Sequence, residues 1–242
     1  MRIGSLFSGC GGLDLGLERS GLGTVAWSCE ALAFNRGILR KHWPEVPCYE
    51  DVVGLDPPPA DIVCGGFPCT DLSDASRGRG AGLAGAESGL WFEMLRIVEA
   101  ASPALVIVEN VDGAARKRWV PVVRRGLHDQ GFASVQIRVR ACDVGAPFKG
   151  SRVFVLAAPY REGQPTLTEH EQVAGLREAA AACWTDWGQP SSAALGVAHG
   201  VPRGMDSTRR GAVGRAVVPQ VAEAVGLFAL YLKERGWWGL AS

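Results

Sequence analysis

The chain has 242 residues, of which 47% are hydrophobic and 21% charged, so it is long and apolar enough for one large domain with a substantial core. Its formal net charge is zero, so any nucleic-acid surface must come from local clusters of basic residues. Seven cysteines without a C-x-x-C pair argue against a disulfide framework and a zinc site, and no apolar run approaches a membrane span. We therefore expect a soluble, cytoplasmic protein that binds neither metal nor membrane.

The chain begins with the pattern of a strand, a glycine loop and a helix. Residues 2–7 are apolar, residues 8–12 read Ser-Gly-Cys-Gly-Gly, and residues 13–18 have helical periodicity. Glycines in this context let the backbone approach a ligand at a helix N-terminus. The dinucleotide fingerprint is incomplete, because Asp14 stands where its third glycine would be.

Acidic residues follow the next two predicted strands. A strand over residues 24–28 leads to Glu30, about 20 residues beyond the glycine loop, where a carboxylate can accept hydrogen bonds from ribose hydroxyls. A strand over residues 48–52 carries Asp51 at its end. Either acid could be a helix cap or simply solvated, but the repeated position favours ligand contact. The pattern favours an adenosine-containing cofactor without a pyrophosphate.

A cysteine follows the fourth predicted strand. Residues 61–64 are apolar, and the following Gly-Gly-Phe-Pro cannot continue a helix, so a loop presents Cys69 at the carboxyl end of a strand. A lone cysteine is more often a core residue. Here two polar motifs downstream favour a nucleophile. Residues 73–89, rich in Gly, Ser and Arg, form a long irregular stretch of the kind that is usually functional or mobile.

The two downstream motifs also lie on predicted strands. A buried strand over residues 105–108 leads into Glu109-Asn110-Val111, after a helix over residues 91–101. Residues 136–140 alternate, which puts the side chains of Gln136, Arg138 and Arg140 on one face of a strand. Two arginine forks on one face suit a phosphate or a base edge. A strand over residues 152–157 is expected to pair with this one.

The last third of the chain divides into a lobe and a returning segment. Residues 158–207 contain an Ala-rich helix and more acids than bases, and we expect a small lobe there. It would be inserted between a catalytic and cofactor-binding domain, residues 1–157, and a C-terminal segment, residues 208–242. That segment carries an apolar-periodic helix from Pro219.

In this order, Phe-Ser-Gly-Cys-Gly-Gly at 7–12, Pro68-Cys69, Glu109-Asn110-Val111 and Gln-Ile-Arg-Val-Arg at 136–140 resemble the motifs of the C5-cytosine DNA methyltransferases. The resemblance implies an α/β fold with a doubly wound, mostly parallel, Rossmann-like sheet and an inserted recognition lobe. It implies S-adenosylmethionine as cofactor and double-stranded DNA as partner, in the cytoplasm of a bacterium or a phage-infected host. We expect a monomer.

The resemblance also implies a mechanism. Cys69 would add to C6 of a flipped-out cytosine, Glu109 would donate to N3, and Arg138 and Arg140 would hold O2 and the adjoining phosphate. It assigns cofactor contacts to Phe7, Gly9, Gly11, Gly12, Glu30, Asp51, Pro68, Arg215, Ala216 and Val217. We expect DNA contacts from Ser73, Arg77, Arg79, Gln136, Arg203 and Arg210.

The sequence departs from the family pattern in its last motif, where Gly214-Arg215-Ala216-Val217 replaces Gly-Asn-Ala-Val. A fixed cation beside the cationic sulfonium would be repelled by a few kcal/mol, whereas a carboxylate on the donor would remove the penalty. Arg215 has two interpretations: it selects carboxy-S-adenosylmethionine and yields 5-carboxymethylcytosine, or it turns outward and ordinary methylation proceeds. Methylation is favoured slightly because its donor is ubiquitous.

Two smaller departures and three rival functions complete the analysis. Thr70 stands where the family often has Gln, and the lobe is short and not basic, which predicts a short or relaxed DNA target or help from a partner. A tRNA cytosine C5-methyltransferase and a catalytically silent DNA-binding relative remain alternatives. A small-molecule methyltransferase ranks last, because it does not explain the paired arginines.

Overall fold

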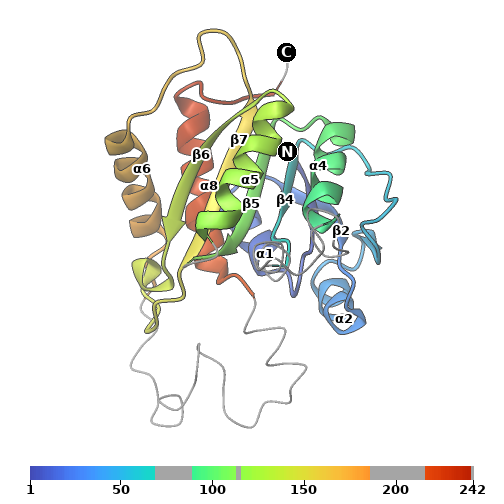
Figure 1. Ribbon diagram of the computed structural model, residues 1–242. Helices are drawn as coiled ribbons and strands as arrows, with labels where there is room; N and C mark the ends of the chain where they lie inside the picture. Colours follow the sequence, from blue (N-terminus) through green and yellow to red (C-terminus); the bar gives the residue numbers. More distant parts are fainter. Residues whose placement is uncertain (69–88, 113–115, 186–215, 241–242) are drawn as a thin grey trace.

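A seven-stranded sheet forms the centre of the structure, a computed structural model that describes residues 1–68, 89–112, 116–185 and 216–240 (Figure 1). The strands are β1 (Arg2–Leu6), β2 (Thr24–Cys29), β3 (Cys48–Tyr49), β4 (Ile62–Gly65), β5 (Leu105–Val111), β6 (Phe132–Val139) and β7 (Arg152–Pro159). The helices are α1 (Gly12–Arg19), α2 (Ala33–His42), α4 (Gly89–Ala101), α5 (Arg116–Asp129), α6 (Glu169–Ala182), α8 (Pro219–Glu234) and the short 3₁₀ helix η1 (Ala141–Val144).

The sheet is parallel except for one strand. Its order is β3-β2-β1-β4-β5-β7-β6, and the first five of these strands pair in parallel. Strand β7 runs antiparallel to both of its neighbours, β5 and β6. The expected doubly wound, mostly parallel sheet is therefore confirmed, as is the expected pairing between the strands now seen as β6 and β7.

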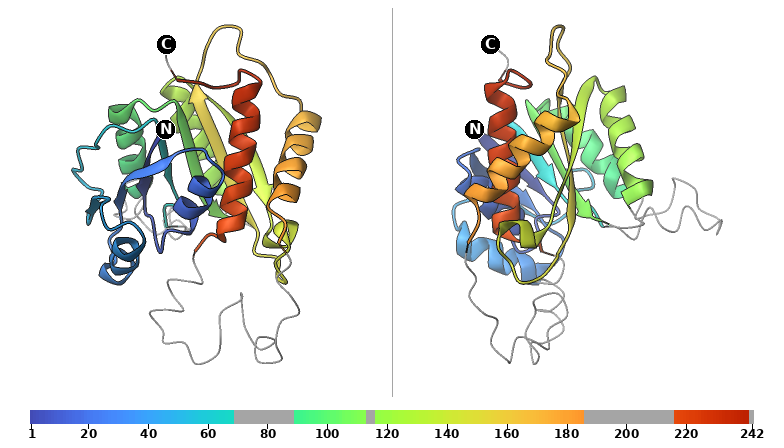
Figure 2. Two further views of the ribbon diagram at one scale, coloured as in Figure 1. Left: turned by 180° about the vertical axis from the view of Figure 1, so that it is seen from behind. Right: turned by 90° about the vertical axis from the view of Figure 1, so that its left-hand side faces the viewer.

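Helices cover both faces of the sheet (Figure 2). Helices α1, α6 and α8 contribute to the core on one face, which we call the α8 face, and α4 and α5 contribute to the core on the other, the α5 face. Side chains along a strand alternate between these two cores. In β5, for example, Leu105 and Ile107 lie on the α8 face, while Val106 and Val108 lie on the α5 face.

The Ala-rich helix of the expected lobe belongs to the main body. Small side chains on α6 let it pack closely against α8: Gly175 lies against the ring of Tyr231, and Ala179 and Ala180 are buried in the core of the α8 face. This packing differs from the expectation of a separate lobe beginning at residue 158. Residues 186–215 of that expected lobe lie outside the described residues.

Candidate active site and cofactor site

The predicted site residues that the structure describes lie at one edge of the sheet. The parallel strands β1, β2, β4 and β5 all end at this edge, and the antiparallel strand β7 begins there. Open α/β sheets bind ligands outside the carboxyl ends of their parallel strands. The turn after each of these strands, and the first residue of β7, can therefore reach a common ligand.

The glycine loop after β1 adopts the backbone that its sequence predicts. Gly9 and Gly11 have φ angles of 59° and 82°, in the left-handed region that glycine adopts without strain, and Phe7, which is not a glycine, has a φ of 54° in the same region. Gly11 is the N-cap of α1. A side chain at Gly12 would collide with the carbonyl oxygen of Val217, just before α8. Two of the predicted cofactor elements, far apart in sequence, are thus in contact.

Glu30 holds the glycine loop from the end of β2. Its Oε2 accepts a hydrogen bond of 2.8 Å from the backbone N–H of Gly9, and its Oε1 accepts from the N–H of Leu32 at 2.8 Å and from Asn35 Nδ2 at 3.2 Å. The residue is only 7% exposed. Asp51, by contrast, is exposed and accepts from the N–H of Val53 in its own turn.

The segment before Cys69 is fixed by the end of β5. Asn110 Nδ2 donates to the carbonyl of Phe67 at 3.0 Å, and Phe67 packs its ring against Trp91 and Trp119. Pro68 follows and is exposed. Cys69 itself lies outside the described residues. The segment that leads to it is fixed at Phe67, which is buried and hydrogen-bonded to Asn110.

Glu109 is a buried carboxyl beside this anchor. A side chain at Gly66 would touch both Oε2 and the carbonyl oxygen of Glu109, so only glycine lets the two strands come this close. Burial raises the pKa of Glu109 to about 7, against the opposing effect of the charge on Arg152. A carboxyl group with a pKa near the operating pH can both donate and accept a proton.

Arg152, which the sequence analysis did not single out, is the cation that faces Glu109. Its Nε lies 2.9 Å from Glu109 Oε1, and the side chains are 16% and 11% exposed. Its Nη2 lies 3.5 Å from the carbonyl oxygen of Ala216. Arg152 therefore joins the carboxyl of β5 to the segment that precedes α8. Its place at the start of the strand predicted over residues 152–157 was the signal that could have identified it.

The two predicted catalytic arginines lie at the same edge of the sheet but pair with other carboxylates than Glu109. Arg138 is on the α5 face of β6, opposite to the face of Glu109, because it alternates with Ile137 and Val139 of the α8 face. Its Nη1 lies 3.6 Å from Asp112 Oδ2, and its side chain is 55% exposed. Gln136 shares the α5 face. The structure does not bring Arg138 together with Glu109 as expected.

Arg140 follows the end of β6 and pairs with Asp143 of η1. Its Nη2 lies 2.6 Å from Asp143 Oδ1, and its side chain is 51% exposed. The backbone N–H of Arg140 donates to the same carboxylate at 2.9 Å. This arginine is thus oriented by η1 rather than by the carboxyl of β5.

Several predicted site residues lie outside the described parts of the chain and receive no structural account. They are Cys69, Ser73, Arg77, Arg79, Arg203, Arg210 and Arg215. Within the described ranges, no group of three or more His, Cys, Asp or Glu side chains could hold a metal ion. None of the helices described combines the length and the hydropathy needed to cross a bilayer.

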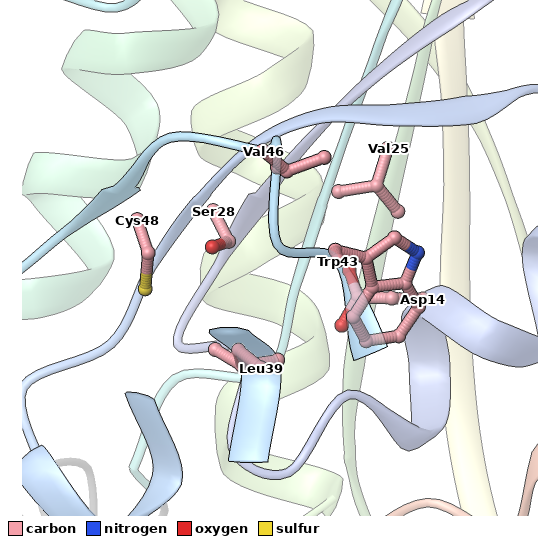
Figure 3. Close-up of a pocket in the computed structure, with 7 residues that line it drawn as sticks. All are labelled: Asp14, Val25, Ser28, Leu39, Trp43, Val46 and Cys48. Atoms are coloured by element: carbon pink, nitrogen blue, oxygen red, sulfur yellow. The ribbon is translucent and has the colours of Figure 1, made fainter. Parts of the chain in front are cut away.

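A small cavity lies behind the glycine loop, between α1, β2 and α2 (Figure 3). Its volume is about 10 Å³, enough for one water molecule and far below the ~300 Å³ of a typical ligand site. The lining residues are Asp14, Val25, Ser28, Leu39, Trp43, Val46 and Cys48. Burial raises the pKa of Asp14 to about 6, and the Ser5 hydroxyl offsets this only in part. This cavity is not the cofactor site.

The strand order, the glycine loop after β1, the acid after β2 and the buried carboxyl on β5 define a Rossmann-like methyltransferase fold. Solved structures agree with this class. A protein described as a DNA modification methyltransferase from a prophage (E. coli) superposes with a TM-score of 0.57 at 24% identity, covering 70% of this chain and 49% of its own. Spodoptera frugiperda DNMT2 gives a TM-score of 0.56 at 18% identity, covering 68% and 52%.

Sequence comparison identifies the family. The profile of the C-5 cytosine-specific DNA methylases matches residues 1–177, and the chain belongs to that family. Type II methyltransferase M2.BsuMI of Bacillus subtilis is 30% identical over 73% of this chain and 51% of its own length. Type II methyltransferase M.NgoFVII of Neisseria gonorrhoeae is 32% identical over 69% and 48%. The chain thus matches about half the length of these curated relatives.

Proposed function

We propose that this protein is a DNA cytosine C5-methyltransferase that uses S-adenosylmethionine as its donor. The observation that carries the proposal is the buried carboxyl of Glu109, which has a pKa of about 7 and lies beside the anchored segment leading into Cys69. Family membership supports the same activity. The names of the Type II relatives further favour DNA modification within a bacterial restriction-modification system, and hence action in the cytoplasm.

The proposed reaction begins with a covalent bond from the Cys69 thiolate to C6 of cytosine. Glu109 donates its proton to N3 as charge develops on the ring, and Arg152 donates to O2. Arg152 takes this role in place of Arg138 and Arg140 because it lies on the same face of the sheet as Glu109 and pairs with its carboxyl group. The bound donor would supply the methyl group to C5 and leave as S-adenosylhomocysteine. Transfer of the C5 proton to a water molecule would then restore the ring and release the Cys69 thiolate.

The described residues fit the adenosine part of the donor. A carboxylate offers about four acceptor positions, and Glu30 uses three of them on protein donors, which leaves Oε2 able to accept one ribose hydroxyl. The left-handed glycine loop lies beside Glu30, and the carbonyl oxygen of Val217 lies against Gly12 of the same loop. When bound, the donor supplies the electrophilic methyl group.

Double-stranded DNA is the proposed substrate, with the target cytosine turned out of the helix, because C6 is not accessible to a thiolate inside a stacked duplex. Arg138 and Arg140 remain proposals for contacts with phosphate. Both are about half exposed at the edge where the site lies, although Asp112 and Asp143 already neutralise part of their charge. We propose that the protein acts as a monomer.

A second candidate function is carboxymethyl transfer. Arg215 precedes Ala216, whose carbonyl oxygen lies near Arg152, and Val217, which contacts Gly12 of the cofactor loop. A cation next to this pair favours a donor that carries a carboxylate, and the product would be 5-carboxymethylcytosine. This candidate shares every step with methylation except the group transferred.

Nucleoside mass spectrometry after reaction with purified protein tests both candidates. Duplex DNA and tRNA are each incubated with S-adenosylmethionine or its carboxylated analogue. We expect 5-methylcytosine in DNA with the ordinary donor; product from the carboxylated donor alone would establish the second candidate. Product in tRNA alone would overturn DNA as the substrate. Cys69→Ser should abolish transfer, whereas Cys142→Ser, a matched change at an exposed cysteine, should not.

A further inference from the structure

Two buried polar residues occupy the first turns of α2, directly after Glu30. Asn35 is 5% exposed and Arg36 is 8% exposed. Polar residues are rarely buried to this degree unless they are paired with specific partners. The helix has no side-chain cap of its own, since its N-cap is Leu32. Both residues instead bind the end of β2, which points to a role in shaping that strand end.

Asn35 acts on the side chain of Glu30. Its Nδ2 donates to Oε1 at 3.2 Å, and the N–H of Leu32 donates to the same oxygen at 2.8 Å. The other oxygen, Oε2, is left for the N–H of Gly9 at 2.8 Å. Two donors therefore hold Oε1 of the carboxylate on the side of α2, and Oε2 points toward the glycine loop.

Arg36 acts on the backbone at the same strand end. Its Nη1 donates to the carbonyl of Glu30 at 3.0 Å and to that of Ala31 at 2.6 Å, while its Nη2 lies 2.9 Å from Glu50 Oε1. A buried guanidinium is stable only with such partners. One cation thus joins the end of β2 to the end of β3, directly before Asp51.

We propose that Asn35 and Arg36 are positioning residues that hold Glu30 against the glycine loop before the donor arrives, and so set the affinity for the donor. The proposal rests on the proposed function, because it takes the glycine loop and Glu30 as the adenosine site. In this arrangement Glu30 does not have to reorient to bind the ribose. The N–H of Gly9 is already hydrogen-bonded to Glu30 before the donor binds. The affinity cost of ordering the loop is then lower.

Isothermal titration with S-adenosylhomocysteine tests the proposal. Asn35→Leu removes one hydrogen bond to a charged group, and we expect the Kd to rise by about tenfold. Asn35→Gln keeps an amide donor and should restore part of the affinity. Arg40→Met, an exposed arginine on the same helix, is the matched control and should leave the Kd unchanged. Arg36→Lys, which keeps the charge but loses the fork, should weaken binding while the protein stays folded.

Two further readouts separate positioning from a general structural role. With saturating donor, kcat and the KM for DNA should remain at the wild-type values in Asn35→Leu. The amide of Gly9 should exchange with deuterium faster in the donor-free variant, because its acceptor is no longer fixed. A wild-type Kd in Asn35→Leu, or equal losses in Kd and kcat, would overturn the proposal. Failure of the wild-type protein to bind S-adenosylhomocysteine would instead count against the proposed function.

Discussion

Glu109 and Arg152 meet across neighbouring antiparallel strands, with Arg152 Nε 2.9 Å from Glu109 Oε1. Arg152 pairs in register with Val111, and Glu109 pairs with Phe154, so the two charged side chains are diagonal neighbours on the α8 face. Burial raises the pKa of the carboxyl and the arginine lowers it, with a net value of about 7. This balance makes the pH dependence of the reaction sensitive to Arg152.

Arg152→Met should move the pH profile of kcat/KM. Arg152 lowers the pKa of Glu109, so its removal leaves that pKa higher than about 7. If protonated Glu109 is the active form, the limb on which kcat/KM falls with rising pH shifts to higher pH. The loss of a donor to the base should also reduce kcat by about 100-fold.

The matched control is Arg138→Met, the same change on the opposite face of the sheet. It should leave the position of that limb unchanged, because Arg138 pairs with Asp112 and not with Glu109. A limb that moves in Arg138→Met and stays in Arg152→Met would restore the original assignment of the catalytic arginine.

Gly66→Ala should impair catalysis without affecting the donor. The added methyl group would overlap Oε2 and the backbone of Glu109 and so displace the carboxyl. A displacement of about 1 Å can reduce kcat by about 100-fold. Single-turnover methylation and titration with S-adenosylhomocysteine measure the two effects separately. Gly37→Ala, where nothing lies within 4 Å of the new methyl group, should keep full activity.

Gly12→Ala should weaken both folding and donor binding. The new methyl group would overlap the carbonyl oxygen of Val217, and neither backbone can move cheaply. Overpacking of this kind costs about 1–3 kcal/mol, which urea unfolding can measure. Titration with S-adenosylhomocysteine should show a higher Kd in the same variant. Unchanged stability and affinity would mean that the backbone at Gly12 or Val217 can move to accommodate the methyl group at little cost in free energy.

Asp14→Asn should stabilise the protein at neutral and alkaline pH. The pKa of Asp14 is raised from 3.8 to about 6 in the folded state, so its contribution to stability is present below pH 3.8 and is lost as pH rises through 6. At 1.36 kcal/mol per unit, the charged form costs up to ~3 kcal/mol above pH 7. The asparagine variant avoids this cost.

Urea unfolding at pH 5 and pH 8 measures the effect. The advantage of Asp14→Asn over the wild type should be larger at pH 8 than at pH 5. Asp56→Asn, at an exposed carboxylate, should show no such difference. An equal loss of stability in Asp14→Asn at both pH values would contradict the prediction. It would mean that the carboxylate makes a favourable contact whose free energy exceeds the cost of burying its charge.

Features that depend on local pattern were predictable from the sequence. The loop of Gly9 and Gly11 and the acid Glu30 follow strands that their apolar runs predict. Glu109 follows the apolar run of residues 105–108, although β5 itself continues to Val111. The expected helix at Pro219 is α8, with Pro219 in its first turn. Each of these features is decided by the composition of a few neighbouring residues and by the rule that parallel strands end at one edge.

Features that depend on register and packing were not predictable. The alternation of residues 136–140 correctly placed Gln136 and Arg138 on one face of a strand. It could not show that Glu109 lies on the opposite face of the sheet, because that depends on how the strands pair. In the sequence we looked for polar residues just after each predicted strand, because parallel strands end at the edge where ligands bind. Strand β7 is antiparallel and begins at that edge, so its first residue, Arg152, was not found in this way. The packing of α6 on α8 depends on small residues such as Gly175, which give no amphipathic signal.

The anchors on either side of residues 186–215 have a practical consequence. The N–H of Thr185 donates to the carbonyl of Val144 in η1, and Val217 lies against Gly12 at the other side of the interval. Both flanks are therefore fixed to the main body by contacts that involve none of the intervening residues. We propose that this interval is the recognition segment expected from the sequence. Exchange of its sequence between relatives should then change which DNA is recognised, while Glu109 on β5 and Arg152 on β7 keep their framework.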